Sequence, residues 1–382
     1  MECTLNLTDG CNFHCSYCYE GKKKHFTVMN EEILRESIKY IIENNNDNFI
    51  SLTFLGGEPL LNKEMLYKAI EIIEQEYPEH KKLMHYRITT NGVFLTEDVI
   101  KFLVGHKFHI SISIDGDRET HNLNRVSNNG EDVYNLIFDN MKNLMTYTDD
   151  FKVRMTVTGN TVDKIVRNVK YFYDFGIKNI HVGIDKGYQW SKEELRCLDR
   201  QLEFLREYYL REVINDDKKI LGTFDYKITT FIAKREVEFC SGGTSGHIVI
   251  NGNGELYPCG YVLNEAAWDL GNVKTGLKSK KFFETIRSHV KENKKCQNCK
   301  IAFTCSGRKC GFLNYLQTGY MNISVEALCM EQKILYRHNY YVMKQLYQKK
   351  HPRLMKMLEL ADKYSIELSD VMKEIMSDAG EV

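Results

Sequence analysis

Apolar side chains recur with two spacings along the first half of the chain. Short runs rich in Val, Ile, Leu and Phe predict strands, and longer stretches with an apolar residue every three or four positions predict helices. The predicted strands are residues 3–7, 51–55, 86–90, 109–114, 153–158 and 179–183. The helical patterns between and after them cover residues 30–43, 63–74, 97–104, 133–144, 162–175 and 192–210.

This strand–helix alternation predicts an α/β fold in which crossover helices connect the strands of a parallel sheet. The pattern leaves open whether the sheet is flat or closed into a partial barrel. Parallel sheets of both kinds bind their ligands at the carboxyl ends of the strands. Functional residues are therefore expected directly after the predicted strands.

The pattern changes close to Cys240. Seven cysteines, several glycines and few periodic runs lie between Cys240 and Cys329, which indicates a small domain held together by metal. Helical patterns return at residues 331–348 and 352–376. The predicted domains are therefore residues 1–235, 236–332 and 333–382.

Composition excludes several classes of protein. Of the 382 residues, 43% are hydrophobic and 27% are charged, which is enough for a sizeable core. Basic and acidic side chains balance at 52 each, so the net charge does not suggest nucleic acid or an anionic membrane as a partner. No apolar run approaches the ~20 residues that span a bilayer. The amino terminus lacks the features of a signal peptide, so we expect a cytoplasmic protein.

Twelve cysteines in a reducing compartment require an explanation other than disulfides, and metal ligation is the first candidate. Cys11, Cys15 and Cys18 stand together directly after the first predicted strand. Three thiolates can hold three irons of a cubane 4Fe–4S cluster and leave the fourth iron open, as catalysis by a metal requires. The alternative is a zinc knuckle with a distant fourth ligand, such as His14.

The Cys-x3-Cys-x2-Cys loop, with Tyr17 before its last cysteine, resembles the signature of the radical S-adenosylmethionine (SAM) superfamily. The resemblance implies a partial (β/α)6 TIM-like barrel whose open iron binds the amino and carboxylate groups of SAM. It also implies that one electron from the cluster cleaves the sulfonium of SAM. The products are methionine and a 5′-deoxyadenosyl radical that abstracts a hydrogen atom from the substrate.

Further motifs follow the other predicted strands in the same order as in that family. Gly56, Gly57, Glu58 and Pro59 are similar to its GGEP motif, which binds the amino group of the methionine part of SAM. Glycines let the backbone approach a ligand closely, and a carboxylate suits an ammonium group. The resemblance implies further polar SAM contacts at Asn91, Ser113, Asp115, Arg125 and Arg154. For a lone arginine the commoner role is a surface ion pair.

The later cysteines resemble a SPASM domain, which binds two auxiliary 4Fe–4S clusters. The resemblance assigns the outer cluster to Cys296, Cys299, Cys305 and Cys329, and the inner one to Cys240, Cys259 and Cys310. Because a cubane has four ligand positions, we expect the inner cluster to have an open iron or a ligand other than cysteine. The last gap of the central run is four residues, where the family usually has three. Two zinc sites are the alternative.

The expected cofactors are thus three 4Fe–4S clusters and SAM, and the expected function is that of a peptide maturase which installs a thioether or carbon–carbon crosslink. Formylglycine formation in sulfatases is the alternative within enzymes. In those enzymes an Asp directly after the Gly-x4-Cys cysteine is the base, and here Gly260 takes that position. A non-catalytic iron–sulfur or zinc protein is the alternative from another class.

The resemblance also implies partners. We expect a peptide substrate and a flavodoxin or ferredoxin as reductant, but neither nucleic acid nor a membrane. Many peptide maturases carry an amino-terminal peptide-recognition domain, whereas here the cysteine triad begins at Cys11. Leader recognition is therefore expected to be absent, to come from a separate protein or to use the carboxyl-terminal helices.

Overall fold

The computed structural model describes residues 1–20, 26–234, 242 and 247–378, without the side chains of residues 279–281 and 283. The chain forms two compact units. The first unit comprises Met1–Arg154 and Ser241–Ser288, and the second comprises Met155–Cys240 and His289–Val382. No described helix is both long and apolar enough to cross a membrane.

A mixed sheet forms the centre of the first unit, with strand order β11-β10-β9-β8-β1-β2-β3-β4-β5. Strands β8 and β1 to β5 run parallel to one another, and the pairs β8–β9, β9–β10 and β10–β11 are antiparallel. The strands are β1 (Glu2–Asn6), β2 (Ile50–Leu55), β3 (Met84–Thr90), β4 (His109–Ser113), β5 (Phe151–Val157, which continues into the second unit), β8 (His247–Ile250), β9 (Glu255–Tyr257), β10 (Gly271–Asn272) and β11 (Gly276–Leu277).

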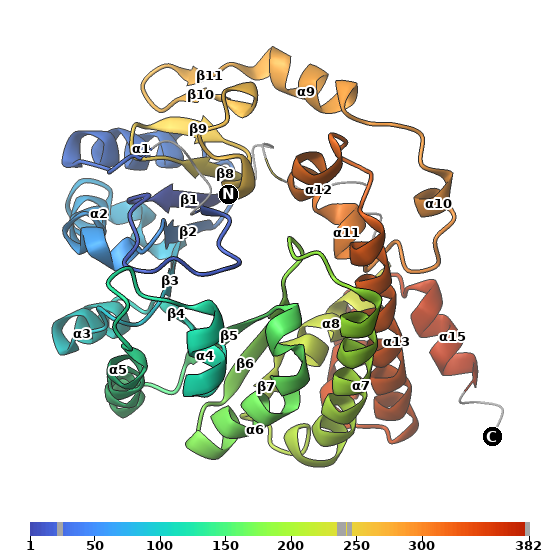
Figure 1. The fold of residues 1–382 in the computed structure, drawn as a ribbon. Helices are drawn as coiled ribbons and strands as arrows, with labels where there is room; N and C mark the ends of the chain where they lie inside the picture. Colours follow the sequence, from blue (N-terminus) through green and yellow to red (C-terminus); the bar gives the residue numbers. More distant parts are fainter. Residues whose placement is uncertain (21–25, 235–241, 243–246, 379–382) are drawn as a thin grey trace. The chain divides into compact units, whose positions relative to one another are not determined.

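Alternation along the parallel strands separates an apolar face of the sheet from a polar one. Leu52 and Phe54 of β2, for example, are at most 1% exposed and lie on the apolar face, whereas Thr53 between them lies on the polar face. Figure 1 shows helices α1, α2, α3 and α5 together on one side of β1 to β4. The apolar face is thus the core of the unit, and the polar face is the one available for chemistry.

Two α-helices of the first unit, α1 and α4, begin at polar side chains that cap them. The side chain of Asn30, for example, accepts a hydrogen bond from the Ile33 amide and starts α1. The α-helices are α1 (Glu31–Glu43), α2 (Lys63–Glu76), α3 (Glu97–Gly105), α4 (Arg118–Asn124), α5 (Tyr134–Tyr147) and α9 (Ser279–Ser288). The 3-10 helices are η2 (Pro59–Asn62), η3 (Pro78–Leu83), η6 (Gly260–Val262) and η7 (Ala266–Trp268).

The second unit is mainly helical, and its long helix α13 packs against α7 and α8. Two short parallel strands, β6 (Asn179–Ile184) and β7 (Ile220–Leu221), accompany the helices. The helices are η4 (Gly159–Lys164), α6 (Ile165–Phe175), α7 (Lys192–Tyr208), η5 (Tyr209–Val213), α8 (Gly222–Ile232), α10 (Lys294–Gln297), α11 (Ser306–Lys309), α12 (Gly311–Thr318), α13 (Glu326–Gln348), α14 (Pro352–Lys363) and α15 (Asp370–Asp378).

The α/β class and the six predicted strands are confirmed, with bounds that differ by up to two residues at each end. The prediction of one helix over residues 352–376 was wrong, because α14 and α15 are separate. The backbone of Ser365 has a φ of +52°, which ends α14, and Ser369 starts α15 by accepting a hydrogen bond from the Met372 amide at 3.0 Å. The predicted helix at 331–348 begins earlier, at Glu326, and so contains Cys329.

We expect Ser369→Ala to lower the free energy of unfolding by about 1–2 kcal/mol. The buried Ser369 hydroxyl caps α15 and also donates to the Phe231 carbonyl, so its loss removes two hydrogen bonds. Urea unfolding followed by circular dichroism measures the change. Ser377→Ala, at an exposed position of the same helix, is the control and should change stability by less than about 0.5 kcal/mol. Equal effects of the two substitutions would contradict the assigned cap.

Candidate iron–sulfur and SAM site

The loop after β1 brings the thiols of Cys11, Cys15 and Cys18 within electrostatic reach of one another. Burial and the charges of Glu58, Cys15 and Cys18 together raise the pKa of Cys11 to about 11, although a hydrogen bond from the Phe13 amide opposes the shift. Burial likewise raises the pKa of Cys15, and the charge of Arg125 opposes this shift. Thiols in such a place become thiolates only if a cation compensates them, and iron would do so.

The arrangement of the cysteine thiols also indicates which kind of metal group the loop can hold. Zinc would draw its thiolates to about 2.3 Å from one centre. Within residues 1–20, 26–234, 242 and 247–378, no three His, Cys, Asp or Glu side chains converge in that manner. A cubane spreads its ligands over separate irons, so three neighbouring thiols in one loop can hold three of those irons. His14, the alternative zinc ligand, lies with its Nδ1 3.2 Å from Oδ1 of Asn128.

Gly56 and Gly57 bring the end of β2 into backbone contact with the cysteine loop. A Cβ atom on Gly56 would lie 2.2 Å from the Thr8 carbonyl oxygen, and one on Gly57 would lie 2.3 Å from the Gly10 carbonyl oxygen. The Gly57 amide donates to the Thr8 carbonyl at 2.8 Å. Gly56 also has a φ of +149°, which favours glycine. In this structure the two glycines therefore let the backbone approach the cysteine loop.

The carboxylate of Glu58 is buried and joins the ends of β2 and β3. It accepts hydrogen bonds from the Leu60 amide at 3.1 Å, the Thr90 hydroxyl at 2.8 Å and the Asn91 amide at 2.7 Å. The Asn91 side chain in turn donates to the side chain of Asn12, inside the cysteine loop, at 2.7 Å. Glu58 thus organises the expected SAM-binding end of the sheet, and its contact with the SAM amino group stays a prediction.

Three interacting side chains, those of Tyr17, Asp115 and Arg125, lie beside Cys15. The Tyr17 hydroxyl donates to Oδ2 of Asp115 at 2.8 Å, and Nε of Arg125 forms an ion pair with Oδ1 at 3.2 Å. The Arg125 guanidinium also lies 5.4 Å from the centre of the Tyr17 ring. Because Asp115 is 1% and Arg125 is 8% exposed, this is not the surface ion pair that a lone arginine usually forms.

Helix α4, which was not predicted from the sequence, holds the cysteine loop from the other side. The Ser16 amide and hydroxyl both donate to Asn124, the last residue of the helix, at 2.8 Å. Asp117 caps α4 by accepting from the Thr120 amide at 3.0 Å. An Asp in the N-cap position followed by a short polar segment was the available signal.

The other two expected SAM contacts, Ser113 and Arg154, are partners in the register of β4 and β5. Both lie on the polar face of the sheet, where Arg154 is exposed and Ser113 is partly buried. The structure thus places Glu58, Asn91, Ser113, Asp115 and Arg154 on the ends or the polar face of neighbouring strands, whereas Tyr17 lies in the cysteine loop and Arg125 directly follows α4. Their roles stay predictions.

The later cysteines divide between the two units. In the second unit, burial raises the pKa of Cys305, and the charges of Cys329 and Cys296 contribute, so these three thiols lie near one another as the outer cluster requires. Cys299 follows in the same turn as Cys296, with its amide donating to the Cys296 carbonyl at 3.3 Å. Cys310, an expected ligand of the inner cluster in the same unit, directly precedes α12.

The ligand set expected for the inner cluster is only partly described. Cys240 lies outside the described residues. Cys259, in the first unit, is close enough to Tyr19 for its charge to act on that side chain, as does the charge of Cys18. The rings of Tyr19 and Tyr261 pack with their centres 4.7 Å apart. Cys259 and the amino-terminal triad therefore share one aromatic neighbour.

The family model of the Radical SAM superfamily matches residues 5–200. The chain belongs to this superfamily. A second model, of the SPASM iron–sulfur cluster-binding domain, matches residues 240–300. The two matches indicate 4Fe–4S clusters and SAM as cofactors. The chain is therefore an enzyme of the radical SAM family, and the assignment of its individual cysteines to clusters stays a prediction.

Several known proteins are similar over most of their length. A cysteine-type anaerobic sulfatase-maturating enzyme of Clostridium perfringens is 27% identical, over 79% of this chain and 87% of that protein. The radical SAM cyclopropyl synthase TigE of Paramaledivibacter caminithermalis is 22% identical, over 88% and 75%. The solved structure of polyhistidine-tagged anSMEcpe with bound AdoMet has a TM-score of 0.76 at 22% identity and covers 94% of this chain and 98% of that one. The likeness to that structure confirms the fold.

We expect Gly57→Ala to destabilise the contact between β2 and the cysteine loop by about 1–3 kcal/mol, because its Cβ would overlap the Gly10 carbonyl. Iron bound by the loop and cleavage of SAM should both fall. Anaerobic iron analysis and the yield of 5′-deoxyadenosine measure the two effects. Gly105→Ala, where an added Cβ has no neighbour within 4 Å, is the matched control and should leave both unchanged. Unchanged iron in the Gly57→Ala protein would contradict the assigned contact.

Burial of Glu58 also predicts a pH dependence. It raises the pKa of this carboxyl from 4.5 to about 7, so folding favours the protonated form. This contribution to stability is fully present below about pH 4.5 and is lost as the pH rises through about 7, on the order of 3 kcal/mol. The wild-type protein and Glu58→Gln should therefore differ in unfolding free energy by an amount that changes with pH across this window. A constant difference would show that the Glu58 pKa is not raised.

Proposed function

We propose that this chain is a peptide maturase that removes a hydrogen atom from a residue of a ribosomally made peptide and installs a thioether or carbon–carbon crosslink. The observation that carries the proposal is the cysteine loop, where Cys11 lies near the buried Glu58 and Cys15 lies near the buried Asp115–Arg125 pair. A hydrogen-abstracting reaction needs a site of this kind, in which reactive groups are fixed by the backbone.

The chain's own residues hold and orient the reactants. When bound, the cluster supplies the electron that splits SAM into methionine and a 5′-deoxyadenosyl radical, which takes the substrate hydrogen. Gly56 and Gly57 hold the end of β2 against the cluster loop. Glu58 offers lone pairs to the SAM ammonium beyond the hydrogen bonds it already accepts. Arg125 favours the thiolate of Cys15 that ligation requires.

We assign the remaining SAM contacts and the further clusters as parts of the same proposal. Tyr17 and Pro59 frame the SAM end of the sheet, and Asn91, Ser113 and Arg154 are polar contacts to SAM. The proposed clusters are three, with an inner one that has a vacant or non-cysteine position. The proposed domain bounds are residues 1–235, 236–332 and 333–382. A flavodoxin or ferredoxin is the proposed reductant, and a separate leader-binding protein remains a proposed partner.

The presence of a glycine at position 260, directly after Cys259, favours crosslinking over formylglycine formation. Glycine has no side chain to accept a proton, so the base expected of a sulfatase maturase is missing at this position. An added Cβ at Gly260 would lie 3.4 Å from the Tyr19 hydroxyl and 3.8 Å from Oε1 of Glu20. The proteins similar to this chain include a radical SAM cyclopropyl synthase and the sporulation killing factor maturation protein SkfB of Bacillus subtilis, whose names describe reactions other than sulfatase maturation.

Formylglycine formation is the second candidate, because the sulfatase-maturating relatives reach 28% identity over 79% of this chain. The two products differ chemically. A crosslink removes two hydrogens per bond and resists hydrazides, whereas formylglycine carries a carbonyl that reacts with them. Mass spectrometry of candidate peptides before and after hydrazide treatment separates the two functions.

We expect anaerobically reconstituted protein to form 5′-deoxyadenosine from SAM when reduced with dithionite, and Cys15→Ala to lower this yield by at least about a hundredfold. Cys197→Ala, on α7 and outside every expected ligand set, is the control and should retain the yield. Chromatography of the products measures both. An active Cys15→Ala protein would exclude a catalytic cluster in this loop.

A further inference from the structure

Several basic side chains lie on the polar face of the first unit's sheet. Arg87 of β3 is the register partner of His109 of β4, and Lys152 and Arg154 of β5 pair with serines of β4 on the same face. His85 lies two residues before Arg87 and so points to the same side. We call this set the cationic face: His85, Arg87, His109, Lys152 and Arg154.

Within the described part of the chain, the side chains of the cationic face form no ion pair or hydrogen bond with the protein. Two acidic residues lie near it in the sheet. Glu2 of β1 is engaged with His247, at 3.6 Å, and Asp150 directly precedes β5. Two arginines and a lysine therefore share a surface that offers them little opposite charge.

The position of Lys152 makes this arrangement costly. Its side chain is partly buried, and burial together with the charges of Arg154 and Arg87 lowers its pKa. Like charges in a partly desolvated place repel one another unless an anion joins them. The Lys39 side chain of α1, by contrast, is exposed to water, which screens its charge.

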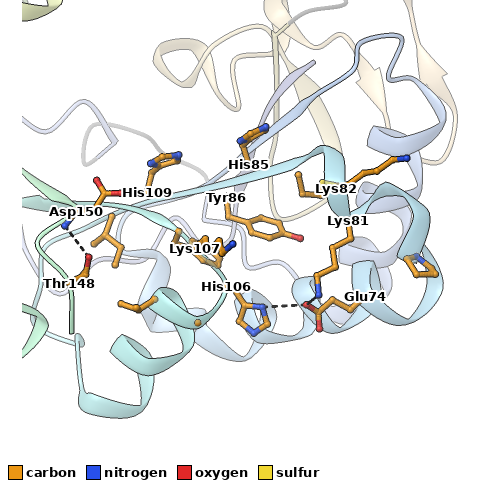
Figure 2. A pocket seen from close by; sticks show the side chains of 16 residues that line it. Glu74, Lys81, Lys82, His85, Tyr86, His106, Lys107, His109, Thr148 and Asp150 are labelled. Carbon is orange, nitrogen blue, oxygen red and sulfur yellow. Dashed lines mark hydrogen bonds and ion pairs between the residues drawn. The ribbon is translucent and has the colours of Figure 1, made fainter.

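A cavity of about 1050 Å³ opens at the amino-terminal ends of β3 and β4, where the cationic face ends. Figure 2 shows His85 and His109 at its edge and Tyr86 inside it. Tyr86 is 7% exposed, and its buried hydroxyl has no hydrogen-bond partner among the described residues. The cavity therefore borders the cationic face at His85 and His109, whereas Tyr86 points to the other face of the sheet.

We propose that the cationic face binds carboxylate side chains of an acidic peptide substrate, with Lys152 and Arg87 as the recognition residues. The proposal rests on the proposed function for the peptide and names its chemical class. Arg154 lies beside Ser113, at the expected SAM end of the sheet. Lys152 lies two residues, about 6.6 Å, further from that end along β5. It is therefore available to bind a second anion in addition to SAM.

Binding to a matched pair of fluorescent dodecapeptides tests the proposal. Both are Gly/Ser-rich, and one carries three Glu residues where the other carries Gln. With holoenzyme and saturating SAM, we expect the Glu peptide to bind at least about tenfold more tightly than the Gln peptide, measured by fluorescence anisotropy. Lys152→Met and Arg87→Gln should each remove most of this preference. Lys152→Arg and the exposed control Lys39→Met should retain it.

Each other outcome overturns the proposal. Equal affinity of the wild-type protein for the two peptides would show that the face recognises no peptide carboxylate. A Glu preference seen only without SAM would assign the face to the SAM carboxylate. A preference kept by both Lys152→Met and Arg87→Gln would place recognition elsewhere. Iron content verifies that each variant is folded and loaded. The binding assay measures no turnover. A failure to form 5′-deoxyadenosine would therefore refute the proposed function and leave the binding result as it stands.

Discussion

Close backbone packing between the GGEP segment and the cysteine loop is the constraint on which the rest of the first unit's site depends. Gly56 and Gly57 leave no room for a side chain between themselves and the carbonyls of Thr8 and Gly10. This packing places Glu58 where it can accept hydrogen bonds from β3's end, and β3's end in turn contacts the loop through Asn91. One set of contacts therefore fixes the ends of three strands.

This packing buries titratable groups whose charges need bound ligands of opposite sign. The site buries thiols, a carboxyl with a pKa of about 7 and the Asp115–Arg125 pair, which together would be an expensive arrangement in an ordinary core. Iron would compensate the thiolates, and the ammonium of SAM would compensate the carboxylates. The same reasoning extends to the polar face of the sheet, where the charges of Arg87, Lys152 and Arg154 have the opposite sign and would be met by carboxylates.

Local patterns in the sequence predicted the elements that are long and strongly periodic. The six strands and the motifs at their ends could be identified because each strand alternates or is uniformly apolar, and each motif is contiguous. Helix α4 is short and polar, so it has no apolar stripe, although Asp117 marks its start. The break between α14 and α15 depends on Ser369 bonding to the distant Phe231, which no local pattern contains. The pairing of β8 with β1 likewise joins residues far apart in the chain.

The same distinction holds for the site. Spacing identified the cysteines, but the network of Tyr17, Asp115 and Arg125 needed the fold to bring α4 and β4 to the loop. The basic residues at alternating positions of β3 and β5 were visible in the sequence, yet their lack of partners appears only in three dimensions.

Electron–nuclear double resonance of the reduced protein with SAM labelled at its amino nitrogen and carboxylate tests the central claim most directly. The account predicts coupling of both labels to one cluster, which Cys15→Ala abolishes; no coupling, or zinc in the loop, would contradict it.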